Sequence, residues 1–250
     1  MKTINIIGAG NVVYHLVNAL NNTKKYKIQN VAVRSLAKAQ AFIQEQLIVT
    51  DISSLKPADI TIISVTDDAI KEVSSAITYT NSLVVHTSGS TAMTVLNNKN
   101  RRGVFYPLQT FSKEKQINFK EVPLCIEAEV ETDLAQLKML ALNLSLNVFE
   151  ISSSQRKSLH VSAVFVSNFV NHMYHIGHTI CKEHQISFDV LKPLIKETAN
   201  KIYYLEPHKA QTGPAVRFDK DTINAHEAFL QNNNYKEIYK LITKSIQQNV

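Results

Sequence analysis

Cysteine and glycine are scarce in this 250-residue chain, and long apolar runs are absent from it. The two cysteines, Cys125 and Cys181, stand in apolar stretches with no metal-ligand spacing, so we expect reduced core residues and a cytoplasmic protein. No run reaches the roughly 18 uninterrupted apolar residues of a membrane span. The first residues already have the pattern of a strand, so no signal peptide is expected.

Charge is also modest. Charged residues make up 19% of the chain and the net charge is +6. The basic residues are scattered, and the densest groups are Lys24-Lys25 and Arg101-Arg102. This pattern does not predict a nucleic-acid interface, although a mildly basic surface attracts small anionic ligands. The hydrophobic content of 44% is that of a globular protein with a substantial core, in one large domain or two smaller ones.

A glycine turn between a strand and a helix opens the chain. The apolar run 4–7 ends in Gly8-Ala9-Gly10, and helical spacing of apolar residues follows at once. In this context Gly8 permits a tight turn and Gly10 lets the backbone approach a pyrophosphate, which the helix N-terminus attracts. The third glycine of the full fingerprint is replaced by Val13, at a position that governs packing. The sequence therefore predicts a dinucleotide contact at Gly8, Ala9, Gly10, Asn11 and Val12.

The pattern of the remaining chain predicts a Rossmann-type α/β fold: a doubly wound, mostly parallel sheet with helices on both faces, followed by an all-helical domain. The expected strands are 4–7, 28–33, 47–49, 60–65, 83–86, 104–105, 124–126 and 147–151. The expected helices are 11–21, 36–46, 69–77, 92–97, 132–144, 153–183, 188–205, 222–231 and 235–247, with Ser35 and Ser90 placed as N-caps. Residues 1–151 are predicted to form the dinucleotide-binding domain, and residues 152–250 the helical domain.

Two strand ends add cofactor contacts. After the second expected strand, where an acidic residue would bind the ribose 2′-hydroxyl of NAD, the chain has Arg34 and Ser35. A guanidinium matches a phosphate, so the pair favours NADP, with NAD possible and an unengaged loop arginine as the alternative. Val65, Thr66 and Asp67 follow the fourth strand beside the glycine turn. Their backbone is expected to touch the ribose on the nicotinamide side, or Asp67 or Asp68 simply caps the next helix.

The next two strand ends supply candidates for the substrate side. His86, Ser88 and Gly89 follow one strand, and Tyr106 begins a proline-stopped loop after another. Ligands of parallel sheets bind at this edge, so these residues are expected to line an active site. The alternatives are a strand cap with a turn glycine and a hydrophobic plug. A serine hydrolase is not supported, because the serines lack the G-x-S-x-G context.

A polar stripe runs along the expected helix 153–183. Its members are His160, Ser167, Asn168, Asn171, His175 and His178, within about 100° of the helix surface. His160 is predicted as the acid/base and Asn168 as an orienting hydrogen-bond donor, with a satisfied interdomain histidine as the alternative. The histidine spacing does not favour a metal site. Further on, Arg217 is predicted to clamp a substrate carboxylate, or to pair with Asp219 and hold its loop.

With these segments in view, the chain resembles the DUF2520 family of Rossmann-like proteins over essentially its whole length. The resemblance rests on IIGAGNV at 6–12, VRS at 33–35, VTDDAI at 65–70, HTSGS at 86–90, GVFYPLQTF at 103–111, LHVSAVFVSNF at 159–169, LKPL at 191–194 and TGPAVRFD at 212–219. The family is similar to pyrroline-5-carboxylate reductase, ketopantoate reductase and the β-hydroxyacid dehydrogenases. That likeness implies an NAD(P)-dependent oxidoreductase, a C-terminal domain like that of 6-phosphogluconate dehydrogenase, and dimerisation through that domain.

Three positions depart from these patterns. Tyr106 stands where members of the family often have histidine, and Phe218 where they often have glycine. The lysine and asparagine of the β-hydroxyacid dehydrogenases are not reproduced, because Val164 precedes Asn168 by four residues. Their proton-transfer chemistry therefore does not carry over, and the role of His160 is inferred from this sequence alone.

The leading prediction is an NADP-dependent reductase or dehydrogenase that acts on a small, anionic carbonyl, imine or hydroxy-acid substrate bound between the two domains. The alternatives are a protein that binds or senses NADP(H) without turnover and, less favoured, a metal-dependent hydrolase. The expected partners are a small-molecule substrate and a second copy of the chain, with no nucleic acid, membrane or metal.

Overall fold

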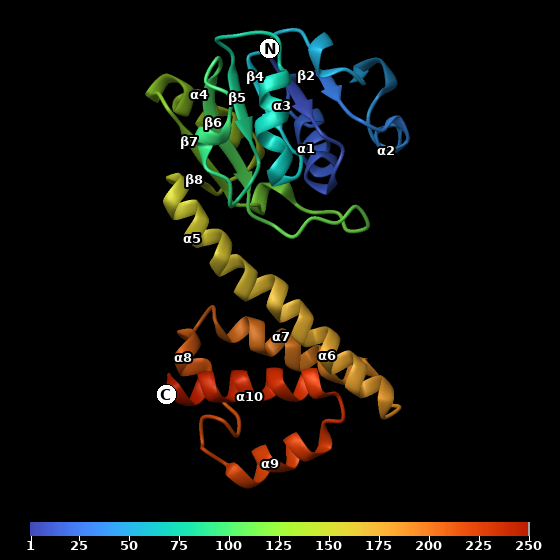
Figure 1. Ribbon diagram of the computed structural model, residues 1–250, viewed down its shortest axis with the longest axis vertical. Helices are drawn as coiled ribbons and strands as arrows, with labels where there is room; N and C mark the ends of the chain where they lie inside the picture. The colour runs from blue at the N-terminus through green and yellow to red at the C-terminus, as the bar shows by residue number, and fades with distance from the viewer. Residues whose placement is uncertain (250) are drawn as a thin grey trace. The chain divides into compact units, whose positions relative to one another are not determined.

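The computed structural model describes residues 1–249, apart from the side chain of Lys38, and forms two compact units, Met1–Ser167 and Asn168–Val250 (Figure 1). The first unit contains an eight-stranded sheet of order β3-β2-β1-β4-β5-β6-β7-β8. Neighbouring strands are parallel except β6 and β7, which are antiparallel. The strands are β1 (Lys2–Ile7), β2 (Tyr26–Ala32), β3 (Ile48–Val49), β4 (Ile60–Ile63), β5 (Leu83–His86), β6 (Arg101–Pro107), β7 (Leu124–Ala128) and β8 (Val148–Glu150). All eight predicted strands are present, and the predicted fold class is confirmed.

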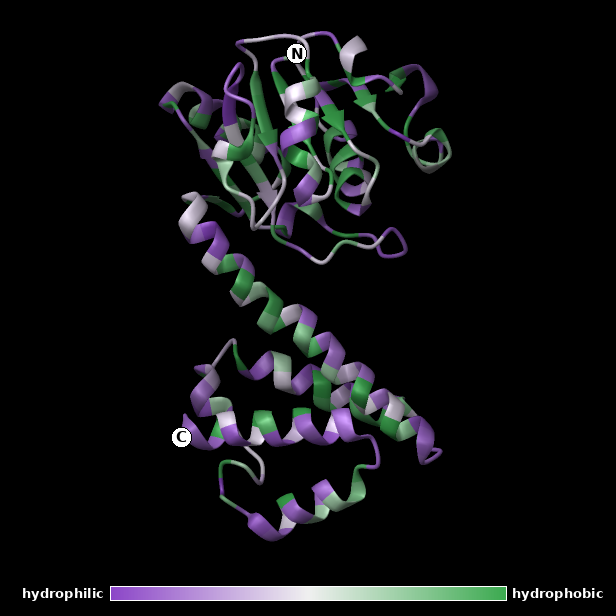
Figure 2. Ribbon diagram, in the orientation of Figure 1, coloured by the Kyte–Doolittle hydropathy of each residue, from purple (hydrophilic) through white to green (hydrophobic). Residues whose placement is uncertain are grey.

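Helices cover both faces of this sheet, as side-chain alternation along the strands requires. Ile6 of β1 packs in one core cluster with Leu16 and Leu137, whereas its neighbour Ile7 packs on the other face with Ile70. The central strands β4 and β5 are buried throughout and mostly apolar (Figure 2), because both of their faces are covered. The helices of this unit are α1 (Asn11–Asn21), α2 (Leu36–Gln40), α3 (Ile70–Ala76), α4 (Glu131–Leu144) and α5 (Ser153–Ala163).

Three predicted helices are shorter in the structure, and one of them, the expected helix 188–205, is α-helical only over Lys192–Lys201. The expected helix 36–46 ends at Gln40, and the expected helix 92–97 is a single 3₁₀ turn, Met93–Val95. In residues 92–97, backbone N–H groups donate to serine hydroxyls of other elements. The N–H of Met93 donates to Ser153 Oγ at 3.1 Å, and that of Asn97 donates to Ser74 Oγ at 3.0 Å. Amides engaged in this way cannot form helical hydrogen bonds, so tertiary contacts overrule the local pattern.

The predicted helix 153–183 is helical along its whole length, with a π-helical segment, Val164–Phe169, between α5 and α6. Ser152 caps its start and forms a reciprocal capping box with Gln155. The helices of the second unit are α6 (Val170–Glu183), α7 (Lys192–Lys201), α8 (Pro207–Ala210), α9 (Lys220–Phe229) and α10 (Asn233–Gln248). No helix in the described chain is long and apolar enough to cross a membrane. The functional boundary at residues 151 and 152 stays a prediction.

Candidate cofactor and active site

Gly8 makes the tight turn after β1. Its φ angle is +129°, and a Cβ atom at this position would lie 2.0 Å from the carbonyl oxygen of Ser64. Its N–H donates to the carbonyl of Ala32 at 2.9 Å. The turn is therefore wedged between the ends of β2 and β4, and only glycine combines this backbone conformation with this close approach.

Gly10 differs from Gly8 because the fold itself does not require a glycine there. It is the N-cap residue of α1 with ordinary extended angles, and a Cβ atom added to it would meet nothing within 4 Å. No side chain among the described residues caps the first turn of α1, which also contains no acidic residue. The N–H groups of that turn therefore face open space, an arrangement that suits a phosphate group.

The residues around Gly10 fix the turn by core packing and by one side-chain hydrogen bond. Val13 is fully buried in the core cluster, so the third glycine of the fingerprint is replaced by a packing residue. Ala9 packs against the same cluster. The side-chain amide of Asn11 donates to the carbonyl of Phe111 at 2.8 Å, which leaves its backbone N–H for a ligand. Val12 is half-buried.

Arg34 and Ser35 follow β2, which lies next to β1 with Ala32 paired to Ile7. Both side chains are exposed. No hydrogen bond or ion pair to the Arg34 guanidinium occurs among residues 1–249, and the hydroxyl of Ser35 does not cap α2. A free guanidinium and a free hydroxyl thus stand at the same edge of the sheet as the glycine turn.

The loops after β4 and β5 are joined by their polar side chains. Thr87 donates its hydroxyl to Ser64 Oγ at 3.0 Å, and Ser90 donates its hydroxyl to the carboxylate of Asp67. Neither Asp67 nor Ser90 caps a helix, so the predicted N-cap at Ser90 and the capping alternative for Asp67 are wrong. Thr66 is exposed beside Asp67, and Val65 is half-buried.

His86 and Ser88 are buried and shape the turn that carries Gly89. His86 is fully buried, and its Nδ1 accepts a hydrogen bond from the N–H of Ser88 at 3.1 Å. The hydroxyl oxygen of Ser88 accepts from the N–H of Ser90 at 3.2 Å and from that of Thr91 at 2.9 Å. Burial, with a contribution from the nearby positive charge of Arg156, lowers the pKa of His86 to about 4. The ring is therefore neutral at physiological pH.

Tyr106 and His160 meet over Gly89. The Tyr106 hydroxyl lies 3.1 Å from His160 Nδ1, and the two rings pack edge to face with centroids 6.1 Å apart. A Cβ atom on Gly89 would lie 2.5 Å from that Nδ1 and 2.7 Å from Tyr106 Cζ, so glycine is needed for the contact. Burial raises the pKa of Tyr106 to about 12, which keeps its hydroxyl protonated. His160 is half-exposed, and no hydrogen bond to its Nε2 occurs in the described chain.

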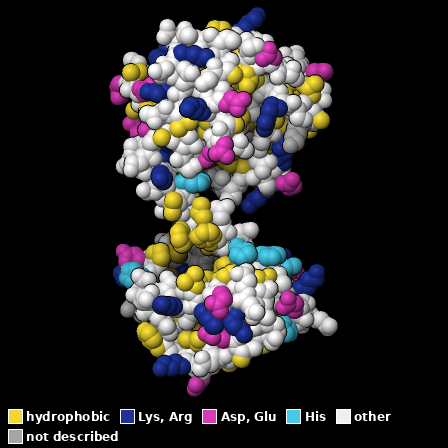
Figure 3. All heavy atoms as spheres, in the orientation of Figure 1, with side chains coloured by type: hydrophobic (Ala, Val, Ile, Leu, Met, Phe, Trp, Pro, Cys, Tyr) yellow, Lys and Arg dark blue, Asp and Glu magenta, His cyan; other side chains and the backbone are white. Residues whose placement is uncertain are grey.

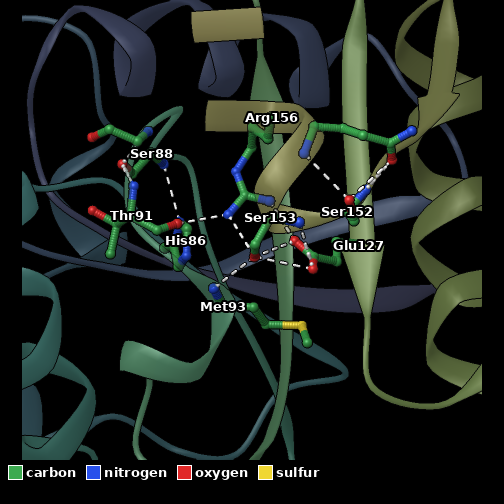
Figure 4. A network of polar contacts seen from close by, with 10 residues as sticks. His86, Ser88, Thr91, Met93, Glu127, Ser152, Ser153 and Arg156 are labelled. Carbon is green, nitrogen blue, oxygen red and sulfur yellow. Dashed lines mark hydrogen bonds and ion pairs between the residues drawn. The ribbon is translucent and has the colours of Figure 1, made fainter. Parts of the chain in front are cut away.

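A buried ion pair beside this contact was not predicted from the sequence (Figure 4). The guanidinium of Arg156 in α5 pairs with the carboxylate of Glu127 in β7 and donates to the carbonyl of Thr91 at 2.6 Å. Ser153 joins both groups through its hydroxyl. The available signal was Glu127, a charged residue at the end of an apolar strand, because a buried charge requires a partner.

Asn168 and Arg217, the remaining predicted site residues, belong to the second unit and are exposed. Asn168 lies in the π-helical segment. No ion pair between Arg217 and Asp219 is formed within the described residues. Asp219 instead caps α9 by accepting from the N–H of Thr222 at 3.1 Å. Arg217 therefore does not hold its loop through that carboxylate. Within residues 1–249, no three His, Cys, Asp or Glu side chains are grouped so as to hold a metal ion.

Comparison with known proteins gives the family. The model of a domain of unknown function, DUF2520, matches residues 122–246. The chain belongs to the DUF2520 family. A candidate NADP oxidoreductase from Bacteroides fragilis is 40% identical, with 99% of this chain and 98% of that chain covered and a TM-score of 0.90. A search of curated proteins found no match.

More distant solved structures share the fold. An imine reductase variant from Myxococcus stipitatus in complex with NAD+ is 13% identical, with 99% and 93% of the two chains covered and a TM-score of 0.69. A pyrroline carboxylate reductase from Plasmodium falciparum with NADP bound is also 13% identical, with 98% of each chain covered and a TM-score of 0.62. At these identities the likeness concerns the fold alone.

Proposed function

We propose that this DUF2520 protein is an NADP-dependent oxidoreductase that transfers hydride to or from a carbonyl, imine or hydroxy carbon of a small anionic molecule. The observation that carries the proposal is the open space at Gly10, over an uncapped helix N-terminus. The N–H groups at the start of α1 have no side-chain cap, and a ligand with phosphate groups would accept hydrogen bonds from them. The name of the Bacteroides fragilis relative supports the same cofactor.

The residues present fit a dinucleotide. The backbone of Gly8, Ala9, Gly10, Asn11 and Val12 would hold the pyrophosphate, and the loop Val65, Thr66 and Asp67 would lie along the ribose on the nicotinamide side. Arg34 and Ser35 would bind the 2′-phosphate, since the guanidinium is exposed and without a partner among the described residues. NAD, which lacks that phosphate, would bind without the contact to Arg34 and Ser35. When bound, the cofactor supplies or accepts the hydride.

His160 is proposed as the proton donor in reduction. We propose that the Tyr106 hydroxyl, which burial keeps protonated, donates to His160 Nδ1, and that the proton of the imidazole is then on Nε2. That nitrogen makes no hydrogen bond in the described chain and can donate to the oxygen or nitrogen that gains electrons as hydride arrives. When Nε2 gives up this proton, Nδ1 would take the hydroxyl proton of Tyr106, so that no imidazolate is left, and in the oxidation direction both protons would return.

Other residues are proposed for binding and orientation. Gly89 and Tyr106 would line the substrate side, with the buried pair His86 and Ser88 behind them as support. Asn168 as an orienting donor and Arg217 as a carboxylate clamp stay predictions; both side chains are exposed. A panel of substrates with and without a carboxylate, tested on Arg217→Ala, would show whether that arginine contributes to KM.

The decisive experiment compares His160→Ala with a matched histidine. His226 also places its Nδ1 against a tyrosine hydroxyl, that of Tyr239 at 2.9 Å, but in the second unit. We expect His160→Ala to keep NADPH affinity and lose turnover on a panel of keto acids and cyclic imines by about 10²-fold or more, while His226→Ala keeps both. Unchanged turnover in His160→Ala would contradict the catalytic role. Tight NADPH binding by the wild type with no turnover of any compound would instead favour a non-catalytic sensor.

A homodimer formed through the helical unit is proposed with this function. Its surface shows apolar side chains (Figure 3), including Leu194 at 61% exposure, Tyr203 at 81% and Leu241 at 70%. Apolar area of this kind is stabilised by a second copy of the chain. Light scattering after size exclusion should give a mass near twice that of the chain.

A cytoplasmic location is proposed as well, since both cysteines are free.

A further inference from the structure

We propose that Arg156 is a positioning residue: anchored by Glu127, it holds α5 against the loop after β5 and so keeps His160 in contact with Tyr106. The inference rests on the proposed role of His160. It concerns a group that does not itself reach the surface, since Arg156 is only 1% exposed.

The Arg156 guanidinium joins three segments that are distant in sequence (Figure 4). One arm pairs with Glu127 at the end of β7, and the other donates to the carbonyl of Thr91 at 2.6 Å and to Ser153 Oγ at 3.2 Å. Removing an arginine from water is costly, and a well-packed apolar pair often stabilises a fold as much or more. A buried pair of this kind is therefore better explained by the geometry it imposes than by stability.

Hydrogen bonds of Ser153 connect α5 to β7 and to the loop after β5 as well. Its N–H donates to Glu127 Oε1 at 2.9 Å and its hydroxyl donates to Oε2 at 2.8 Å, while Ser153 Oγ accepts from the N–H of Met93 at 3.1 Å. The first turn of α5 is thus bound to the loop at both Thr91 and Met93, and one carboxylate orients both of the α5 side chains involved.

The consequence appears one helical turn further along α5. His160 follows Arg156 by four residues, so both lie on the same face of the helix. Gly89 precedes Thr91 by two residues, and there the loop approaches His160 so closely that a Cβ atom would lie 2.5 Å from Nδ1. If α5 and the loop separate, the imidazole is free to turn away from the Tyr106 hydroxyl. Its tautomer is then no longer set by that hydroxyl, and Nε2 is no longer held in one direction.

The test replaces the ion pair and reads the imidazole directly. In Arg156→Met/Glu127→Met the pair becomes apolar at similar volume, so no charge is left buried. The matched control is Arg102→Met/Glu129→Met, which removes an Arg–Glu pair at the same end of β7 that does not involve α5. Long-range ¹H–¹⁵N spectra of the ligand-free protein report the tautomer, and the His160 signal is assigned by its loss in His160→Ala.

We expect the wild type and the control to show one His160 tautomer with the proton on Nε2. The Arg156→Met/Glu127→Met variant, with a melting temperature close to that of the control, should show averaging of both tautomers. Its kcat should fall about tenfold or more, with unchanged NADPH affinity. If this variant does not fold, Arg156→Lys carries the test, because lysine keeps the pair with Glu127 but lacks the fork that reaches Thr91. A single, wild-type-like tautomer in the folded variants would overturn the proposal.

The spectra need no turnover. A protein that binds NADPH but reduces nothing would contradict the proposed function and still leave the tautomer measurable. The two conclusions can therefore fail separately.

Discussion

Substitution of alanine is expected to destabilise the fold at Gly8 but not at Gly10. Gly8→Ala places a methyl group 2.0 Å from the Ser64 carbonyl oxygen and requires alanine to adopt a φ of +129°. The overlap and the backbone strain each cost about 1–3 kcal/mol, so we expect a loss of about 2–6 kcal/mol in the free energy of unfolding. Cofactor binding would then be lost together with the fold.

Gly10→Ala should change cofactor binding without changing the stability of the fold. The added methyl meets nothing within 4 Å, and the angles φ −79° and ψ −174° are allowed for alanine. Alanine is a poorer N-cap than glycine but reduces the freedom of the unfolded chain, and these effects of up to about 1 kcal/mol each have opposite signs. We therefore expect the unfolding free energy to change by less than about 1 kcal/mol.

The NADPH affinity of Gly10→Ala should nevertheless fall. A methyl group above the first turn of α1 keeps a pyrophosphate away from the backbone N–H groups, and each hydrogen bond to a charged oxygen contributes about 1.5–3 kcal/mol. The loss of one such bond raises the Kd about ten- to hundredfold. Urea unfolding and fluorescence titration with NADPH, done on the same preparations, give both quantities. If Gly10→Ala binds NADPH as tightly as the wild type does, the open space at Gly10 is not the pyrophosphate site.

Further predictions concern the cofactor's phosphate, the buried histidine and the contact at Gly89. Arg34→Ala should weaken NADPH about ten- to hundredfold in a fluorescence titration and leave NADH unchanged; equal affinities of the wild type for both cofactors would contradict the assignment. Burial lowers the pKa of His86 from 6.5 to about 4. Between pH 6.5 and about pH 4, His86 is therefore protonated in the unfolded chain and neutral in the folded one. Stability should therefore fall as the pH drops through that window, by up to about 3 kcal/mol, and urea midpoints of His86→Gln should show a smaller dependence. Gly89→Ala should cost about 1–3 kcal/mol in a thermal melt and separate His160 from Tyr106, seen as loss of the single tautomer; a wild-type spectrum would count against the contact.

Much of the fold was predictable because the signals are local. The runs Ile60–Ile63 and Leu83–His86 are mostly apolar without polar alternation, which is typical of strands buried on both faces. The strand, glycine turn and helix at the start of the chain follow one another directly, so α1 was predicted at its observed bounds, Asn11–Asn21. The start of the helix predicted at residue 153 is also observed, and Ser152 caps it.

Residues 92–97 show where local signals fail. Their composition is compatible with a helix, but the amides of Met93 and Asn97 are engaged by Ser153 and Ser74 from other elements. Such partners are chosen by the assembled fold, so no window of sequence around residue 92 contains the information.

The sequence by itself determined the class of fold, the place of the cofactor turn and a small set of polar residues at strand ends. It favoured His160 as the acid/base and placed His86 in the lining of the active site, but it could not show which of the two rings is buried. The tertiary structure separated them: complete burial keeps the His86 ring neutral and inside the fold, whereas His160 is half-exposed with Tyr106 on its Nδ1. Likewise, Arg156 and Glu127 meet across 29 positions of the chain. Burial and long-range pairing arise only when distant segments pack together, and for that reason they are properties of the folded chain.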